Sequence, residues 1–412
     1  TSQCSLPFLR DYGFELITAM LPGLIANDIF VTQPARFKNY SIFYQDFEHQ
    51  TTKGRITAGD PAISGLQAAN IDENYTKDSE VDRQIGTGSG ASGGPFTVGA
   101  SVLFLPVIAG SVTVTTLDTS ENPLVAVDDG AGNFSGDATG TINYTTGAIS
   151  ITFTSNVKSG EPVLLTYEFV GEGSQENAAE YGLTIRELQG IAKERRLRYN
   201  FSIESQFSYR QQFGRSIDAD LMAAAVAQVR KEIDQDLLLT ANTASRVIAG
   251  PNASAGTVQF DRTPDTGVQY YFWREQFIDT LNAAGNLIFK ATGFGVGNVA
   301  VGGINFKQVC ETIGGRFKPS GLTGVKGSHW IGDIDGGKIR CFVEPAMGDD
   351  EFFVTYKGGP LEVGLSYNPW MPLYASDPHM LDDGKLHRYL ITSTGKRMVN
   401  TKLFVGGTLI QS

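Results

Sequence analysis

Cysteine and histidine are scarce in this sequence of 412 residues. They are limited to Cys4, Cys310 and Cys341 and to His49, His329, His379 and His387. An odd number of cysteines without metal-binding spacing favours buried thiols in a reducing compartment over a disulfide framework. The histidines form no H-x-x-x-H pair and no Cys-His cluster, so the sequence predicts no metal centre.

Long apolar runs and an excess of positive charge are also missing. The run VLFLPVIA at 102–109 is far shorter than the roughly 20 residues that a membrane span requires. The formal net charge is −11, which argues against a general nucleic-acid binder, because neutralising phosphates needs clustered lysines and arginines. The chain opens at Thr1 rather than at a methionine, which favours removal of an N-terminal piece by processing, with an artificially trimmed chain as the alternative.

Recognisable catalytic motifs are absent too. The sequence has no G-x-S-x-G nucleophile elbow and no Ser-x-x-Lys motif with its companions. The glycine-rich segment GFGVGNVAVGG at 293–303 precedes a predicted strand, whereas a dinucleotide fingerprint follows one, so turn glycines are the better interpretation. The sequence therefore predicts no enzyme, no catalytic residue and no cofactor.

One polar loop leaves a choice open. In DDGAGNFSGD, the oxygens of Asp128, Asp129, Asn133 and Asp137 have a spacing that could hold calcium. The loop lacks the alternating ligands and the closing glutamate of an EF-hand, so a polar hairpin loop is favoured and calcium is the alternative. The segment DIDGG at 333–337 offers the same choice with fewer ligands.

What the sequence does have is a segment that differs from its surroundings. Residues 86–173 carry one basic residue, Lys158, and eight acidic ones, and they open with the linker-like GTGSGASGG. Short alternating strands follow, which predict an inserted β-sandwich or barrel. Within it, GTINYTTGAISITF at 140–153 predicts a hairpin that turns at Thr146 and Gly147, with Tyr144 opposite Ile149 and Ile142 opposite Ile151.

The flanking regions predict an α+β host. Residues 1–85 contain too few apolar residues for a core of their own, and we expect an extended arm and loop. A helix is predicted from Asp218 to Leu239, with one apolar stripe at spacings of three and four. The stripe consists of Met222, Val226, Val229, Ile233 and Leu237. A second helix at 270–289, a strand, turn and helix at 295–313, and late strands between 338 and 410 complete the pattern.

Three segments resemble the major capsid protein of tailed bacteriophages, of the T-even-type myovirus family. The first, MLPGLIANDIFVTQP, matches at Pro22, Leu24, Ile25, Ala26, Asp28, Gln33 and Pro34. The second, at 196–238, is similar to that family's strand, short helix and long spine helix. The third, TYKGGPLEVGLSYNPWMPL, matches at Tyr356, Lys357, Gly358, Gly364, Leu365, Tyr367, Pro369, Pro372 and Leu373. The insert at 86–173 does not resemble the family's usual insertion.

The resemblance implies the Hong-Kong-phage capsid fold. Its parts would be an N-terminal arm and extended loop at 1–85, the inserted β-domain at 86–173, a peripheral domain with the spine helix at 174–293, an axial domain at 294–372, and return strands of the peripheral domain at 373–412. It also implies a virion shell subunit that assembles with itself in the host bacterial cytoplasm around packaged DNA. Scaffold, portal, prohead protease, vertex and decoration proteins would be its partners, without a membrane or sequence-specific DNA binding.

Within that resemblance, the arm and loop would become ordered on neighbouring subunits. Arg55, Lys77 and Arg83 are therefore candidates for contacts between subunits. A carbohydrate-binding or adhesion protein that uses the β-insert is the alternative function. The size of the assembly separates the two, because a lattice forms particles of megadalton mass and an adhesin stays a small oligomer.

Overall fold

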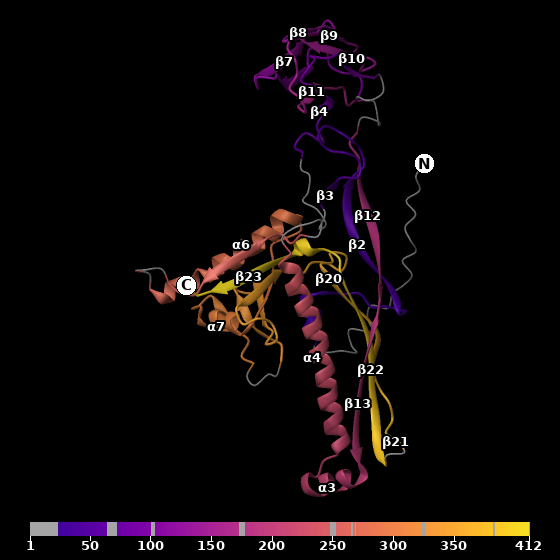
Figure 1. Cartoon of the computed structure of the whole chain (residues 1–412), viewed down its shortest axis with the longest axis vertical. Helices are drawn as coiled ribbons and strands as arrows, with labels where there is room; N and C mark the ends of the chain where they lie inside the picture. The colour runs from indigo at the N-terminus through magenta and orange to yellow at the C-terminus, as the bar shows by residue number, and fades with distance from the viewer. Residues whose placement is uncertain are drawn as a thin grey trace. The chain divides into compact units, whose positions relative to one another are not determined.

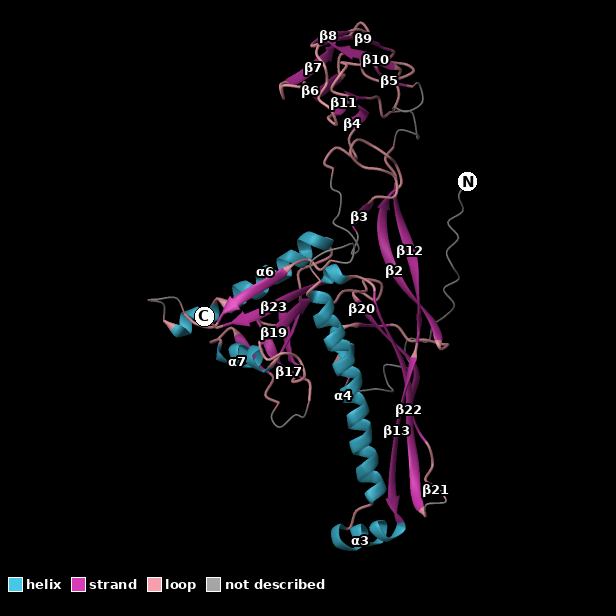
Figure 2. Cartoon of the chain, in the orientation of Figure 1, coloured by secondary structure: helices cyan, strands magenta, loops and turns pink. Residues whose placement is uncertain are grey.

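The computed structural model combines helices and strands, as the α+β prediction requires (Figure 2). It describes residues 24–63, 72–99, 104–172, 178–247, 253–264, 267, 269–322, 327–381 and 384–411. These residues divide into two compact units. One holds residues 24–46, 63 and 185–411, and the other holds residues 47–62 and 72–184. Each unit is described by itself.

The first unit contains most of the helices (Figure 1). Its helices are α2 (Ala26–Ile29), α3 (Ile203–Phe213), α4 (Ile217–Ser245), α5 (Tyr270–Glu275), α6 (Phe277–Thr292), α7 (Ile304–Thr312) and the 3-10 turn η2 (Thr401–Leu403). Its strands are β1 (Val31–Thr32), β13 (Lys193–Ser202), β14 (Thr257–Asp261), β15 (Val299–Gly302), β16 (Phe317–Pro319), β17 (His329–Ile334), β18 (Ile339–Val343), β19 (Glu351–Thr355), β20 (Leu365–Ala375), β21 (His379–Met380), β22 (Lys385–Met398) and β23 (Phe404–Ile410).

A seven-stranded sheet forms the main core, in the order β14-β23-β19-β15-β18-β17-β16. All four residues of β15 are buried, as expected of a central strand covered on both faces. Helices α6, α7 and α4 contact these strands. Phe277, Phe306 and Phe352 meet edge-on or stacked, with ring centroids 5.5 to 5.8 Å apart. Burying each of them contributes about 1.5–3 kcal/mol relative to exposure.

The chain's last strand joins this main sheet. Strand β23 pairs in parallel with β14 and antiparallel with β19. The part of 373–412 expected to return to the peripheral domain is thus divided: β22 pairs with β13, and β23 lies in the main sheet. Sequence alternation alone does not distinguish these neighbours, because partner choice depends on contacts distant in the chain.

The spine helix α4 extends farther than predicted, from Ile217 to Ser245. It lies beside β13 and β22, two long antiparallel strands of a second sheet (Figure 1). Asp218 and Asp220 occupy its first turn, where carboxylates suit the helix dipole. The segment predicted as a second helix forms two helices in the structure, because α5 ends before Gln276 and α6 begins after it.

The second unit is a β-sandwich with its own apolar core. One sheet has the order β4-β11-β6-β7-β8 and the other β5-β10-β9. These strands are β4 (Ser79–Thr87), β5 (Phe96–Val98), β6 (Thr113–Leu117), β7 (Pro123–Asp128), β8 (Phe134–Gly136), β9 (Ala138–Ile142), β10 (Ile149–Phe153) and β11 (Pro162–Glu168). Strand β4 begins at Ser79, so the sheet starts upstream of the expected boundary at Gly86. Strands β2 (Asn39–His49), β3 (Pro61–Ile63) and β12 (Tyr181–Ile191) form a third sheet, in the order β12-β2-β3.

The predicted hairpin exists, but its predicted register is wrong. Ile149 pairs with Ile142, and Ile151 pairs with Gly140. The reason is a longer turn over residues 143–148, where the side chain of Asn143 accepts hydrogen bonds from the backbone N–H groups of Thr145 (3.0 Å) and Thr146 (3.1 Å). Tyr144 therefore leaves the ladder and donates its hydroxyl to Asp128 at 2.7 Å.

The end of the expected arm is part of the main core. Leu24, Ala26, Ile29 and Phe30 are buried against α4 and the seven-stranded sheet. Apolar side chains here find their burial within the same chain, whereas the sequence suggested that the arm depends on neighbours. Residues 1–23, with Cys4 and Pro22, lie outside the described residues.

Candidate functional site

The first and third resembling segments lie side by side in the structure. Strand β1 pairs in parallel with β20, with Val31 opposite Ser366 and Thr32 opposite Tyr367. The backbone N–H of Gln33 continues the ladder to the carbonyl of Tyr367 at 3.0 Å. Parallel pairing of this kind needs no local hairpin, so it can join residues that are 335 positions apart.

Buried amide side chains fasten this pairing. Gln33, 8% exposed, donates from Nε2 to the carbonyls of Phe43 (2.8 Å) and Pro360 (3.0 Å). Its Oε1 accepts from the N–H of Phe43 at 3.1 Å. Asn368 donates from Nδ2 to the carbonyl of Gln33 at 2.8 Å. Because an unpaired buried amide is costly, these matched bonds specify how the two segments dock.

Lys357 adds a charged link between the same segments. Its Nζ donates to the backbone carbonyl of Asn27. Asn298 fixes the lysine backbone, donating to the Lys357 carbonyl (2.9 Å) and accepting from the Lys357 N–H (2.8 Å). Burial lowers the pKa of Lys357, and the nearby Asp28 carboxylate opposes that shift.

The second segment contributes Asp234, a carboxylate on the buried face of α4. It is 5% exposed and accepts a hydrogen bond from the backbone N–H of Ala26 at 3.1 Å. Burial raises its pKa to about 6, although hydrogen bonds from the backbone of Ala26 and Ile25 act in the opposite direction. The three segments thus meet at one place, which we call the motif junction; its residues are Ala26, Asn27, Gln33, Asp234, Lys357 and Asn368.

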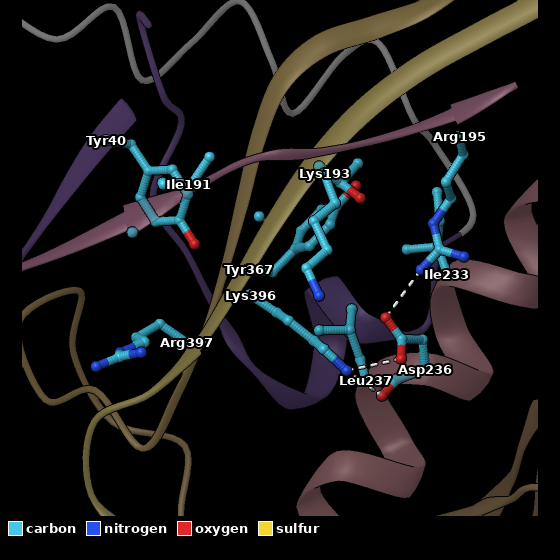
Figure 3. A pocket seen from close by; sticks show the side chains of 13 residues that line it. Tyr40, Ile191, Lys193, Arg195, Ile233, Asp236, Leu237, Tyr367, Lys396 and Arg397 are labelled. Carbon is cyan, nitrogen blue, oxygen red and sulfur yellow. Dashed lines mark hydrogen bonds and ion pairs between the residues drawn. The ribbon is translucent and has the colours of Figure 1, made fainter. Parts of the chain in front are cut away.

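A cavity of about 340 Å³ lies beside the motif junction, between α4 and the long strands (Figure 3). It is lined by Tyr40, Gly190, Ile191, Lys193, Arg195, Ile233, Asp236, Leu237, Tyr367, Thr394, Gly395, Lys396 and Arg397, and we call it the basic pocket. Figure 3 shows Asp236 of α4 between Arg195 of β13, at 2.8 Å, and Lys396 of β22, at 2.6 Å. These bonds hold the spine helix to the strands.

Comparison with protein families shows to which family the chain belongs. A family model described as "Major capsid protein Gp23" matches residues 9–407. The match extends over all three resembling segments and over both compact units. The chain belongs to the Gp23 major capsid protein family. It is a major capsid shell protein, and the resemblance inferred from the three segments is confirmed.

Solved structures similar to this capsid protein include phage capsids. The capsid of Myoviridae phage XM1 is 9% identical, with a TM-score of 0.37 over 59% of this chain and 82% of that one. The mature capsid of bacteriophage PhiM1 is 8% identical, with a TM-score of 0.38 over 59% and 78%. A Microbacterium phage Oxtober96 chain is 9% identical, with a TM-score of 0.37 over 77% and 93%. Comparison with curated proteins gave no significant match.

The residues of the predicted apolar stripe on the spine helix become more buried toward the C-terminal end of the helix. Val229, Ile233 and Leu237 are buried in the main core, and Met222 and Val226 are only partly covered. The covered end of α4 is the one that meets the seven-stranded sheet. Toward its N-terminus, the helix contacts β13 and β22 through polar groups, including the ion pair of Asp218 with Arg388 at 2.6 Å.

The three candidates for contacts between subunits differ in their surroundings. The side chain of Arg55 is 70% exposed and forms an ion pair with Asp82. Lys77 is exposed and donates to Asn74 at 3.0 Å. Arg83, in contrast, lies in β4 with its side chain 15% exposed, and it pairs with the fully covered carboxylate of Glu80 at 3.0 Å.

The aspartates among the calcium candidates already accept hydrogen bonds from neighbouring backbone groups and from Tyr144. Asp128 accepts from the N–H groups of Gly110 (2.6 Å) and Gly130 (3.2 Å) as well as from Tyr144. Asp129 accepts from Ala131 (2.7 Å) and Asn133 (3.0 Å), and Asp137 accepts from Val125 (3.0 Å). These are the hydrogen bonds of turns and strand ends. Over the described ranges, no three His, Cys, Asp or Glu side chains are grouped to hold a metal ion.

The cysteines and histidines occupy varied places. Cys310 and Cys341 are free and buried, and burial raises the pKa of the Cys310 thiol. His379 and His387 lie on paired strands with ring centroids 6.4 Å apart. None of the helices in the described part of the chain is long and apolar enough to cross a membrane.

The residues that build the motif junction and the basic pocket were mostly missed from sequence. One signal was available for Asp234, because a carboxylate beside Ile233 and Leu237 interrupts the apolar face of the helix. The meeting of Arg195, Asp236 and Lys396 had no such signal, since each is an ordinary surface charge in its own element.

Proposed function

We propose that this major capsid protein assembles through capsomers, as hexamers and pentamers, into the icosahedral or prolate shell of a tailed bacteriophage and encloses the packaged DNA. The family match over residues 9–407 is the observation that supports this most directly. The formal net charge of −11 is consistent with a shell that surrounds DNA without sequence-specific binding.

The parts of the chain would then have separate roles. The residues before β4 serve as arm and extended loop, and the β-domain, which begins with β4 and ends at residue 173, is an insert. Residues 174–293 and the late strands through β22 form the peripheral domain, and residues 294–372 with β23 form the axial domain of the Hong-Kong-phage arrangement. Arg55 and Lys77, exposed on turns, are suited to contacts between subunits. Subunits that contact one another head to tail can close into rings by symmetry.

The remaining proposals concern processing and partners. The subunit is a structural protein rather than an enzyme, needs no cofactor, and is assembled in the host bacterial cytoplasm. A scaffold protein, a portal and a prohead protease act on it, and vertex and decoration proteins can join the shell.

Electron microscopy of the expressed protein tests the proposal. Negative staining after co-expression with its scaffold partner should reveal shells or capsomer arrays of megadalton mass. A carbohydrate-binding protein that uses the β-insert would remain a small oligomer, and that outcome would reject the shell proposal. No comparison favours the adhesion alternative.

A further inference from the structure

The basic pocket holds more positive than negative charge. Four cationic side chains line it, from Lys193, Arg195, Lys396 and Arg397, against the single carboxylate of Asp236. Asp236 already binds Arg195 and Lys396. Over the described residues, the side chains of Lys193 and Arg397 have neither an ion pair nor a hydrogen bond, and both are exposed. Two cations therefore remain free to bind an anion.

A buried hydroxyl in the same pocket lacks a partner. Tyr367 is 1% exposed, and its hydroxyl forms no hydrogen bond to any described residue. A buried polar group without a partner loses its hydration and gains nothing in return. Burial raises the pKa of Tyr367, the nearby Asp234 carboxylate raises it further, and Arg195 of the pocket acts in the opposite direction. An oxyanion in the pocket would accept a hydrogen bond from this hydroxyl.

The pocket continues into a neighbouring groove that suits a polypeptide segment. A second cavity, of about 380 Å³, shares Tyr40, Gly190 and Ile191 with it. The ring of Tyr40 fits against two glycines, since a Cβ on Gly395 would come within 2.2 Å of it and one on Gly190 within 2.5 Å. Strand β12 is at the edge of its sheet, and Ile191 at its end is 65% exposed. An edge strand beside an apolar side chain is suited to receive extended chain.

We propose that the basic pocket is an oxyanion-binding site, formed by Lys193, Arg397 and the hydroxyl of Tyr367, and that its occupant in the shell is a carboxylate side chain from a second copy of this chain. The part concerning the second copy rests on the proposed shell function. A chain with 44 acidic residues and 33 basic ones offers many such carboxylates. Arginine and lysine bind carboxylates through charge-assisted hydrogen bonds, and a tyrosine hydroxyl adds a neutral donor.

Inorganic phosphate is the probe for the site itself. Calorimetric titration into the unassembled subunit, at fixed ionic strength, should detect phosphate binding. The double variant Lys193→Gln and Arg397→Gln should weaken it about tenfold or more, the loss expected when a charge-assisted hydrogen bond is removed. Lys231→Gln, on the exposed side of α4, is the matched control and should bind as the wild type does.

Tyr367→Phe separates a ligand role from a structural one. If the hydroxyl awaits an anion, its removal should weaken phosphate binding several-fold and leave the melting temperature of the free subunit unchanged or higher. If the hydroxyl instead serves only a buried water, the variant should melt lower and bind phosphate as before, and that result would overturn its place in the site.

Assembly experiments test whether a carboxylate of a second copy occupies the basic pocket. Phosphate should slow assembly more than chloride does at equal ionic strength, and the double variant should assemble poorly although it melts at the wild-type temperature. Phosphate binding without any effect of phosphate or of the double variant on assembly would overturn the second-copy carboxylate and leave a free anion as the ligand. Absence of phosphate binding, or equal binding by the double variant, would overturn the site. Failure of the wild type to form shells would reject the shell function, and the titration would still decide the pocket.

Discussion

The carboxylate of Asp234 accepts the backbone N–H of Ala26 at 3.1 Å, and this bond joins the spine helix to the N-terminal segment. Asp234 is 5% exposed, and burial raises its pKa to about 6. An ionised carboxylate in such a place is costly unless hydrogen bonds compensate, and here backbone donors supply only part of that compensation. The residue that closes the motif junction is therefore also sensitive to pH.

Stability should fall as Asp234 loses its proton. The folded pKa of about 6 lies above the unfolded value of about 3.9, so the native state holds the proton more tightly. This contribution is fully present below about pH 4 and is lost as the pH rises through about 6, with a total of about 3 kcal/mol. Asp234→Asn should flatten this part of the profile in urea unfolding between pH 4.5 and 7.5. Glu232→Gln, exposed on the same helix, should leave the slope intact; if it flattens the profile equally, Asp234 is not the titrating group.

The buried face of the spine helix should reject charge. Val229 is 6% exposed in the main core, so Val229→Asp leaves a carboxylate without a partner and should cost about 3–5 kcal/mol. Gln228 is exposed and donates to Glu232 at 2.9 Å, and Gln228→Asp should cost under about 0.5 kcal/mol. Urea unfolding and soluble yield compare the two variants. Equal losses would contradict the helix register described here.

A buried carboxylate also stabilises the β-sandwich. Glu80 accepts from the hydroxyl of Tyr167 at 2.5 Å, from the N–H of Gly54 at 2.9 Å and from Arg83. Glu80→Ala leaves these buried donors without an acceptor and should lower the free energy of unfolding by about 3–5 kcal/mol. Glu121→Ala removes only an exposed ion pair with Lys158, worth about 0–1 kcal/mol. If calorimetry shows similar shifts in the melting temperature of the sandwich for the two variants, the buried Glu80 network stabilises it no more than the exposed ion pair does.

The position of β4 predicts which fragments fold alone. A fragment of residues 72–172 retains β4 and the contacts of Glu80 with Tyr167 and Arg83, and it should melt cooperatively with the circular dichroism of a β-protein. A fragment of residues 86–173 loses most of β4, which pairs with β11 at the edge of its sheet. It should be less stable or unfolded. Equal melting temperatures would show that the sandwich begins at Gly86 after all.

Protease sensitivity should differ among the three basic candidates. In the unassembled subunit, trypsin should cut after Arg55 and Lys77, which lie exposed outside paired strands. Arg83 should resist, because β4 pairs with β11 opposite Leu165 and cleavage requires locally opened backbone. Limited digestion with mass spectrometry, on subunits and on particles, measures all three. Protection of Arg55 and Lys77 only in particles would place them at contacts between subunits, and cutting at Arg83 as fast as at Arg55 would contradict the strand.

Local pattern was enough to locate most helices and strands. The spacing of Val229, Ile233 and Leu237 predicts the buried face of α4 because these side chains recur once per helical turn. Alternation predicts the strands of the sandwich for the same kind of reason, since successive side chains point to opposite faces. The register of the 140–153 hairpin was predicted wrongly, because the side chain of Asn143 accepts hydrogen bonds that make the turn longer.

The sequence by itself determined the α+β composition, the apolar faces, the acidic β-rich segment and the motifs that identify the family. Only the tertiary structure decided that β1 pairs with β20, that β23 joins the main sheet and that Arg195, Asp236 and Lys396 meet. The physical reason is range: a helical or strand period is written in neighbouring residues, whereas a parallel pairing or a buried ion pair depends on groups that only the folded chain brings together.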